Sequence, residues 1–239
     1  MKGNKILIAM AAGSGTRMGS ETPKQFLSLG GIPILRRMME TFIAAVPGIK
    51  VVTVLPNDYL SFWKEYCLSA EFTYPQTLVG GGFTRFHSVR NALERVPDGA
   101  IVAIHDGVRP MVSRDLVRNM FAEMEEKGLD ALIPVVPSVD TLKILDRTSG
   151  PAGGTLVEPE GEEIDRSRVY AAQTPQMFRS EAIREAYSQP FDTAFTDDAS
   201  VARKKGIPLS FCDGERYNFK ITSPEDLALA ELIVSSTCR

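Results

Sequence analysis

The sequence predicts an α/β fold in which a mostly parallel, twisted sheet is flanked by helices. Two observations carry this prediction. Short apolar runs alternate with segments whose apolar residues recur at helical spacing, and right-handed crossovers place successive strands of such units in parallel. The 239 residues, 44% hydrophobic and 24% charged, also suit one well-buried core, so residues 1–239 are expected to form a single domain.

Three apolar runs are the clearest strands. Residues 5–11, 51–55 and 100–104 read as buried strands because they are almost continuously apolar. Ligands of parallel sheets bind beyond the carboxyl ends of the strands. Every loop that follows a strand is therefore a candidate site.

Four helices have recognisable starts. The first is expected to begin at Pro33, a residue suited to the first helical position, and the second to follow Ser113 as its N-cap. The third follows the glycines at 80–82. The last is expected to begin with Ser223 as N-cap and Pro224 as its first helical residue.

Residues 138–168 break this alternation. They are rich in glycine, proline and acidic residues and have weak period-2 patterns at their ends. The segment is predicted to leave the domain either as a surface loop or as a β-arm that reaches a partner subunit. Its length favours a functional element over a plain connection.

Charge and cysteine content exclude several classes of protein. A net charge of -3 gives no basic field for nucleic acid, so an anionic ligand has to be met by a few placed cations. Cys67, Cys212 and Cys238 are far apart and odd in number, which argues against a disulfide framework or a thiolate metal site. A reducing cytoplasm fits this pattern.

The first twelve residues superficially match a secretory signal, since Lys2 and Lys5 precede an apolar run. That run is short and leads directly into a glycine-rich loop, and no segment approaches the ~20 apolar residues of a membrane span. The chain is therefore expected to be cytoplasmic, with no membrane partner.

The strongest local signal is a glycine-rich loop after the first strand. It reads Ala11-Ala12-Gly13-Ser14-Gly15-Thr16-Arg17-Met18-Gly19 and continues to Pro23-Lys24-Gln25-Phe26. Small residues let backbone N–H groups approach phosphate oxygens, and Arg17 and Lys24 add positive charge. The spacing matches neither a Walker loop nor a dinucleotide fingerprint. A flexible turn that binds nothing is the alternative, but such a turn needs no pair of cations.

A second glycine cluster opens the third helix. It reads Gly80-Gly81-Gly82-Phe83-Thr84-Arg85-Phe86-His87-Ser88. Arg85 and Ser88 lie near the helix N-terminus, which suits a second phosphate or a base edge. A simple strand-to-helix turn with a solvated arginine is the alternative.

An acidic residue ends the strand at 100–104, in the run Ile104-His105-Asp106-Gly107-Val108-Arg109-Pro110. Asp106 is expected to hold Mg²⁺ beside substrate phosphates, because this ion prefers oxygen ligands there. An Asp-Gly turn with no ligand is the alternative. His105 is predicted to be structural, since no serine or cysteine motif accompanies it.

Five further motifs are weak singly but informative in their order. They are Val139-Asp140-Thr141-Leu142-Lys143, Asp165-Arg166-Ser167, Gln173-Thr174-Pro175-Gln176, Thr196-Asp197-Asp198-Ala199-Ser200 and Asn218-Phe219-Lys220-Ile221-Thr222. Together with the three loops, they resemble the cytidylyltransferases of the non-mevalonate isoprenoid pathway. These enzymes join CTP to 2-C-methyl-D-erythritol 4-phosphate and release pyrophosphate. The resemblance spans nearly the whole chain.

The resemblance implies a Rossmann-like nucleotidyltransferase fold, a requirement for Mg²⁺, and a homodimer formed through a protruding β-arm at 138–168. It implies that Arg17 and Lys24 hold the triphosphate and stabilise the transition state, with Asp106 beside the metal. The residues that would surround CTP are Ala11, Ala12, Gly13, Gly15, Gly82, Arg85, Ser88 and Asp106. Those that would form the acceptor pocket, some of them across the dimer, are Arg109, Thr141, Arg166, Thr196 and Lys220.

Two departures from the family pattern are visible. Phe83 stands where family members often carry an acidic residue, which puts the base or ribose contact at that position in question. Gly107 and Val108 replace the two alanines that commonly follow His-Asp.

The implied chemistry needs no protein nucleophile. A phosphate monoester is largely dianionic at neutral pH and can attack the α-phosphorus directly. The reaction instead needs positive charge and in-line positioning of two anions. Arg17, Lys24 and Mg²⁺ would supply the charge, and Arg166 and Lys220 the positioning.

Three alternative functions remain. A ribitol 5-phosphate cytidylyltransferase would share the loop and the reaction, although Lys143 and the Asp165-Arg166-Ser167 run look more like the isoprenoid enzyme. An enzyme of the same fold that uses UTP or another nucleotide on a sugar phosphate is more distant. A non-catalytic CTP sensor would need affinity but no transition-state charge, so the combination of Arg17, Lys24 and Asp106 argues against it.

Overall fold

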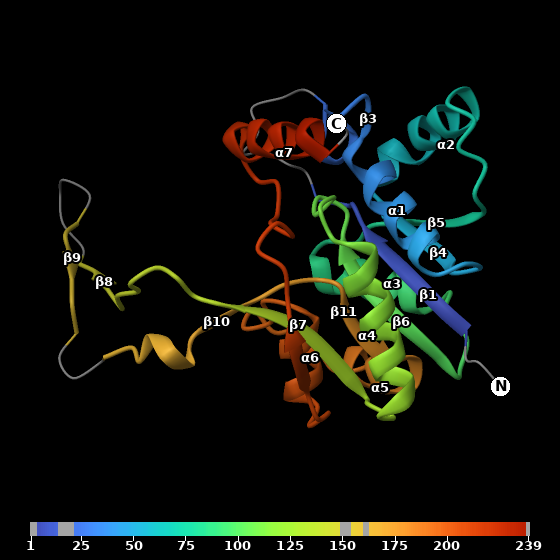
Figure 1. Cartoon of the computed structure of the whole chain (residues 1–239). Helices are drawn as coiled ribbons and strands as arrows, with labels where there is room; N and C mark the ends of the chain where they lie inside the picture. Colours follow the sequence, from blue (N-terminus) through green and yellow to red (C-terminus); the bar gives the residue numbers. More distant parts are fainter. Residues whose placement is uncertain (1–3, 14–21, 149–153, 160–162, 238–239) are drawn as a thin grey trace.

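The computed structural model describes residues 4–13, 22–148, 154–159 and 163–237; Figure 1 shows a sheet with helices packed around it and a long arm. The strands of the main sheet are β1 (Asn4–Met10), β4 (Lys50–Leu55), β5 (Gln76–Gly80), β6 (Ala100–Asp106), β7 (Ala131–Pro137), β10 (Tyr170–Ala172), β11 (Gln176–Arg179) and β12 (Ser210–Asp213). The helices are α1 (Ile34–Ala45), α2 (Leu60–Ser69), α3 (Arg85–Leu93), α4 (Arg114–Glu126), α5 (Ser180–Tyr187), α6 (Asp198–Lys204) and α7 (Pro224–Thr237).

The main sheet is mixed and mostly parallel, as predicted. Its strand order is β10-β7-β11-β6-β1-β4-β5, and β12 pairs with β7. The run β6-β1-β4-β5 is parallel, and β12 is parallel to β7. β11 and β10 are antiparallel to their neighbours. The carboxyl ends of β1, β4, β5 and β6 therefore share one edge.

The three predicted strands are confirmed, with changes at their ends. β1 lies one residue earlier than the predicted 5–11, and β4 begins one residue before the predicted 51–55. β6 extends two residues beyond the predicted 100–104, because Met10 of β1 is still in register with Asp106. This extension buries His105 and places Asp106 at the end of a central strand.

The predicted helix starts are confirmed at two of the positions named. The Ser113 side chain accepts a hydrogen bond from the Leu116 N–H at 2.9 Å, and α7 begins at Pro224. Pro33 does not occupy the predicted first helical position, because α1 begins one residue later, at Ile34. Pro33 is the N-cap of α1, with an extended ψ of 142°, because it also pairs in the short hairpin β2 (Ser28–Leu29) and β3 (Ile32–Pro33).

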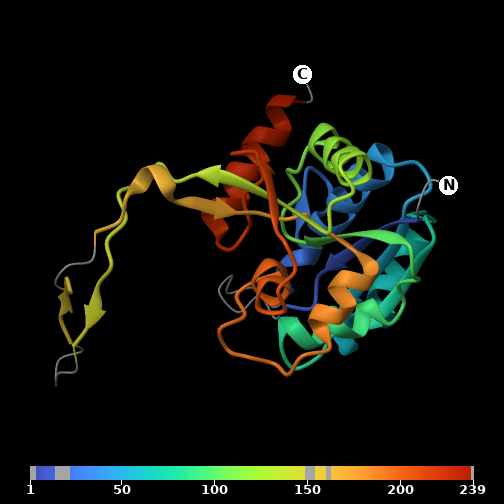
Figure 2. The same cartoon turned by 90° about the horizontal axis from the view of Figure 1, so that it is seen from below.

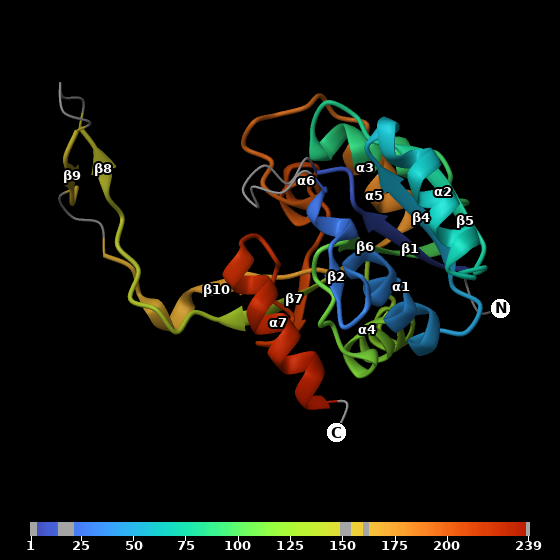
Figure 3. The ribbon, with the colours of Figure 1, turned by 90° about the horizontal axis from the view of Figure 1, so that it is seen from above.

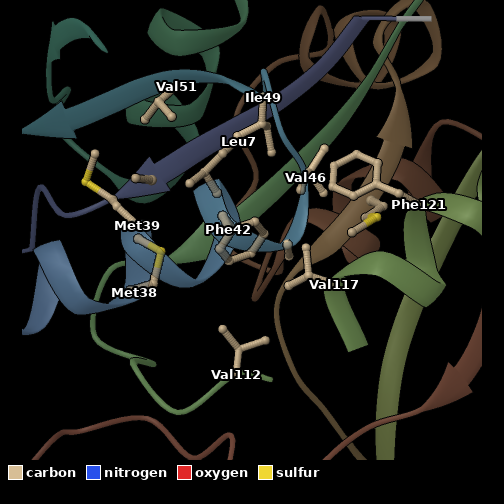
Figure 4. Packing of buried hydrophobic residues seen from close by; sticks show 14 of the residues in the cluster. Leu7, Met38, Met39, Phe42, Val46, Ile49, Val51, Val112, Val117 and Phe121 are labelled. Atoms are coloured by element: carbon tan, nitrogen blue, oxygen red, sulfur yellow. The ribbon is translucent and has the colours of Figure 1, made fainter. Parts of the chain in front are cut away.

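Two hydrophobic layers enclose the sheet. Along β1, Leu7 and Ala9 face the layer formed with α1, α2 and α4, whereas Ile6 and Ile8 face the layer formed with α3, α5 and α6. Phe42 of α1 lies in the middle of the first layer, surrounded by apolar side chains from β1, β4 and α4 (Figure 4). Because both faces of β1 are buried, its residues form a continuous apolar run.

The excursion predicted at 138–168 is an arm that leaves the body after β7 and returns at β10 (Figures 2 and 3). At its base the Ser138 N–H donates to the Val169 carbonyl at 3.0 Å. Further out, β8 (Asp146–Arg147) pairs antiparallel with β9 (Leu156–Val157). No described helix has the length and apolar character needed to cross a membrane. The assignment of residues 1–239 to a single domain stays a prediction.

Phe42→Ala is expected to lower the free energy of unfolding by about 3–5 kcal/mol, because it removes a fully buried ring from the first layer. Urea denaturation measures the change. Leu68→Ala is the control: Leu68 is 79% exposed, so its loss is expected to change stability by less than about 0.5 kcal/mol. Equal effects of the two substitutions would contradict this packing.

Candidate functional site

A short 3-10 turn (Lys24–Phe26) brings Lys24 beside the first glycine-rich loop. The buried Gln25 amide fixes the turn by donating to the carbonyls of Ala11 at 2.7 Å and Gly13 at 3.4 Å. Sequence reasoning named Gln25 in the motif but gave it no role. Gly15 and Arg17 lie outside the described residues.

The second glycine loop, at residues 80–82, packs closely against neighbouring backbone and side chains. The Gly81 N–H donates to the Leu55 carbonyl at 2.8 Å, and the Gly82 N–H donates to the Ser88 hydroxyl at 3.0 Å. A Cβ at Gly81 would lie 2.7 Å from that of Ala12, and one at Gly82 would lie 2.5 Å from that of His87. Only glycine fits at either position, so these residues are required by close packing.

One cavity of about 430 Å³ opens at the carboxyl edge of the parallel strands. Of the predicted site residues, it is lined by Ala11, Ala12, Gly13, Lys24, Gly82, Arg85, Ser88, Asp106 and Lys220. The three predicted loops therefore converge on a single site. Most of the set assigned to CTP is present there, together with one member of the acceptor set.

Asp106 lies among three cations. Its Oδ2 is 3.1 Å from Lys220 Nζ and 3.3 Å from Arg109 Nε, and its Oδ1 is 3.9 Å from Arg85 Nε. Burial alone would raise the pKa of Asp106, but Arg85, Lys220 and Arg109 together hold this pKa far below its usual range. Asp106 is therefore a carboxylate at any pH at which the protein is used.

The side chains at the cavity could hold a divalent cation only if a bound substrate supplied most of the coordinating oxygens. Within the described ranges, no group of three or more histidine, cysteine, aspartate or glutamate side chains is placed to hold a metal. Asp106 offers a single carboxylate at the cavity. Mg²⁺ characteristically binds through one or two carboxylates together with substrate phosphates, so this site suits a metal that arrives with a phosphorylated ligand.

Arg85 has a structural partner that the sequence did not reveal. Its guanidinium donates to both oxygens of Asp198, at 2.7 and 2.6 Å, and Tyr187 donates its hydroxyl to the same carboxylate at 2.5 Å. Burial lowers the pKa of Arg85, but the contact with Asp198 outweighs it and keeps the guanidinium charged. The pair joins the start of α3 to the start of α6 beside the cavity.

His105 is structural in its contacts, as predicted. It is fully buried, and its two ring nitrogens lie 3.0 Å from the Thr174 hydroxyl and 3.0 Å from the Arg109 carbonyl. The Arg109 carbonyl can only accept a hydrogen bond, so we assign the ring proton to Nε2. Nδ1 then accepts from the Thr174 hydroxyl, whose oxygen also accepts from the Asp106 N–H. Burial lowers the pKa of His105 to about 4, so the ring is neutral.

The same network reaches the Lys220 segment. The Asn218 amide donates to the Thr174 carbonyl at 2.8 Å, and Arg109 donates to the Asn218 carbonyl at 2.7 Å. The Gln-Thr-Pro-Gln and Asn-x-Lys motifs thus support the site by holding the turn around Asp106.

The predicted acceptor set is not gathered within one chain. Arg109 and Lys220 adjoin the cavity through Asp106. Thr141 and Arg166 belong to the exposed arm, where Arg166 donates to the Val139 carbonyl at 3.4 Å. Thr196 is exposed and donates its N–H to Ser200 at the start of α6. The arm runs away from the body (Figure 1), and neither Thr141 nor Arg166 is among the residues that line the cavity.

Glycine loops at the carboxyl ends of parallel strands, with lysines and one aspartate around a single cavity, define an α/β protein of the nucleotide-binding, Rossmann-like class. The particular family follows from comparison. The family model described as IspD, 2-C-methyl-D-erythritol 4-phosphate cytidylyltransferase, matches residues 5–236, and the chain belongs to this family.

Individual relatives agree over the full length of the chain. The enzyme of that name from Porphyromonas gingivalis ATCC 33277 is 42% identical over 99% of this chain and 100% of its own. The one from Geobacillus kaustophilus is 36% identical over 98% of each. The crystal structure of the Thermus thermophilus enzyme is 31% identical, with a TM-score of 0.70 over 98% of this chain and 100% of its own.

Stability between pH 6.5 and 4 is expected to depend on His105. The folded-state pKa is near 4 and the unfolded value near 6.5, so the unfolded state binds more protons in this window and stability falls as the pH drops through it. The His105 contribution is complete above pH 6.5. Its loss down to pH 4 amounts to roughly 3 kcal/mol.

His105→Gln is expected to flatten the pH dependence between 6.5 and 4, whatever its effect on stability at pH 7. Urea denaturation at a series of pH values measures both slopes. An unchanged slope in His105→Gln would contradict a buried neutral imidazole.

Proposed function

We propose that this chain transfers the cytidylyl group of CTP to 2-C-methyl-D-erythritol 4-phosphate, with release of pyrophosphate, in isoprenoid precursor synthesis. The match of the family model to residues 5–236 carries the proposal. The cavity at the carboxyl edge of the sheet supports it, since this cavity contains the residue types that the reaction needs. The ribitol phosphate enzyme and the CTP sensor are not favoured, since the relatives described above share the methylerythritol phosphate name.

The reaction is a direct displacement at phosphorus. An oxygen of the acceptor's phosphate dianion bonds to the α-phosphorus of CTP as the bond from that phosphorus to the bridging oxygen breaks, and the electron pair leaves with pyrophosphate. Lys24, at the cavity, would stabilise the charge that develops on the α-phosphate and the departing pyrophosphate. Arg17 is proposed to stabilise the same charge, an assignment that rests on its place in the glycine-rich motif of the sequence.

Asp106 would hold Mg²⁺ together with phosphate oxygens of CTP. The metal, when bound, supplies positive charge to the triphosphate and fixes its orientation. Arg85 and Ser88 line the same cavity and, with Gly82, would lie beside the cytosine. Ala11, Ala12 and Gly13 would surround the phosphates with backbone.

The acceptor site is proposed to be shared between two subunits of a homodimer. Arg109 and Lys220 come from the chain that holds CTP, and Thr141 and Arg166 from the arm of the partner; Thr196 would complete the set. Support comes from the apolar side chains that the arm and its base expose, which a partner would cover: Val139, Leu142, Ile144, Leu145, Leu156, Val157 and Tyr170. We also propose a cytoplasmic location, for which the free thiols of Cys67 and Cys212 are suited.

Lys24→Ala is expected to lower kcat by roughly 10²-fold or more, by analogy with the loss of other transition-state charge donors. Pyrophosphate release from CTP, Mg²⁺ and methylerythritol phosphate measures it. Lys64→Ala, which removes an exposed lysine on α2, is the matched control and should leave turnover unchanged. Near-normal turnover in Lys24→Ala would overturn the role of Lys24. Wild-type turnover with ribitol 5-phosphate or with UTP in preference would overturn the choice of substrates.

Mixed dimers test the shared site. Lys24→Ala and Arg166→Ala are each expected to be weakly active alone. If the arm serves the partner's cavity, a hybrid of the two contains one intact site, so an equal mixture after subunit exchange should recover roughly a quarter of wild-type turnover. Absence of recovery, with exchange shown by mass spectrometry of the hybrid, would mean that Arg166 acts in its own chain or not at all.

A further inference from the structure

Phe83 is the departure from the family pattern noted in the sequence, and its side chain is fully exposed. It lines the cavity that contains Lys24 and Asp106, and it also lines a second hollow together with Asn57 and Arg90. An isolated exposed phenylalanine would need no explanation. One at the rim of a candidate nucleotide site does.

The backbone that carries Phe83 is fixed. The two preceding residues, Gly81 and Gly82, are hydrogen-bonded to Leu55 and Ser88 and pack within Cβ contact of Ala12 and His87. The next residue, Thr84, is the N-cap of α3. The ring is therefore positioned by rotation about two side-chain bonds only, so little conformational entropy is lost when it packs on a ligand.

The Phe83 ring is fully exposed to solvent in the free protein. Its ring contact in the described part of the chain is an edge-on approach to His87, with centroids 6.3 Å apart. Strand order places β1 and β4 between β5, which leads into the Phe83 loop, and β6, which ends at Asp106. The Phe83 loop therefore reaches the cavity from a different strand end than Asp106 does. The nucleoside of a bound nucleotide would lie on the Phe83 side if its phosphates met Lys24 and Asp106.

We propose that Phe83 packs on the nucleoside of the bound nucleotide, with its ring stacked against the base. The inference rests on the function proposed above and names a contact of the same site. A phenyl ring has no hydrogen-bonding atom, so Phe83 adds affinity without distinguishing cytosine from uracil.

Calorimetric titration with CTP and Mg²⁺ tests the contact in the full-length chain. Phe83→Ala should raise the Kd for CTP by roughly 5- to 150-fold, the range typical for loss of one base–aromatic stack, and the Kd for UTP by a similar factor. The thermal midpoint should not change, because the ring is fully exposed. Leu68→Ala, which removes another exposed apolar side chain from α2, is the control and should bind CTP as the wild type does.

Phe83→Trp should retain affinity, and its fluorescence reports the stack directly. The chain contains one tryptophan, the fully buried Trp63, so the new signal can be separated from the wild-type background. Quenching of that signal by CTP is expected. An unchanged Kd in Phe83→Ala, or no fluorescence response in Phe83→Trp, would overturn the inference.

The two proposals fail separately. Wild-type pyrophosphate release together with unaltered CTP binding in Phe83→Ala would overturn only the role of Phe83. Weakened CTP binding in Phe83→Ala together with no wild-type turnover would support the contact and overturn the proposed function.

Discussion

The rest of the site depends on one constraint, the placement of the Asp106 carboxylate at the end of β6 among Arg85, Arg109 and Lys220. These cations come from three separate stretches of the chain. Without the carboxylate, the three cations would repel one another with no opposite charge to offset the repulsion. Asp106 thus assembles a positive site in a protein whose net charge is -3.

The supporting contacts keep this arrangement in place before any ligand binds. Asp198 orients Arg85 through two hydrogen bonds, and the neutral His105 ties the turn after β6 to Thr174. Such preorganisation matters for transfer between two anions, because groups that are already oriented need no rearrangement as charge develops. Buried side chains that no ligand would touch are therefore part of how the site works.

Sequence reasoning found the loops but missed several of their partners, for a physical reason. Periodicity and capping are local, so they placed β1, α4 and the three loops on elements correctly. Asp198 is 113 residues from Arg85, and nothing in the local pattern links the two. The arm strands β8 and β9 are two residues each, too short for an alternating pattern to register. Motif order also cannot tell whether Arg166 serves its own cavity or a neighbour's.

Charge balance is consistent with both the proposed metal and the proposed second subunit. Among the described side chains at the cavity, Lys24, Arg85, Arg109 and Lys220 oppose Asp106 and Asp198, which leaves two positive charges. A divalent cation would raise this to about the four negative charges of a triphosphate. The acceptor brings a further dianion that these groups do not balance. Balancing that dianion would need additional cations, which Arg17 and an arm arginine such as Arg166 are proposed to supply.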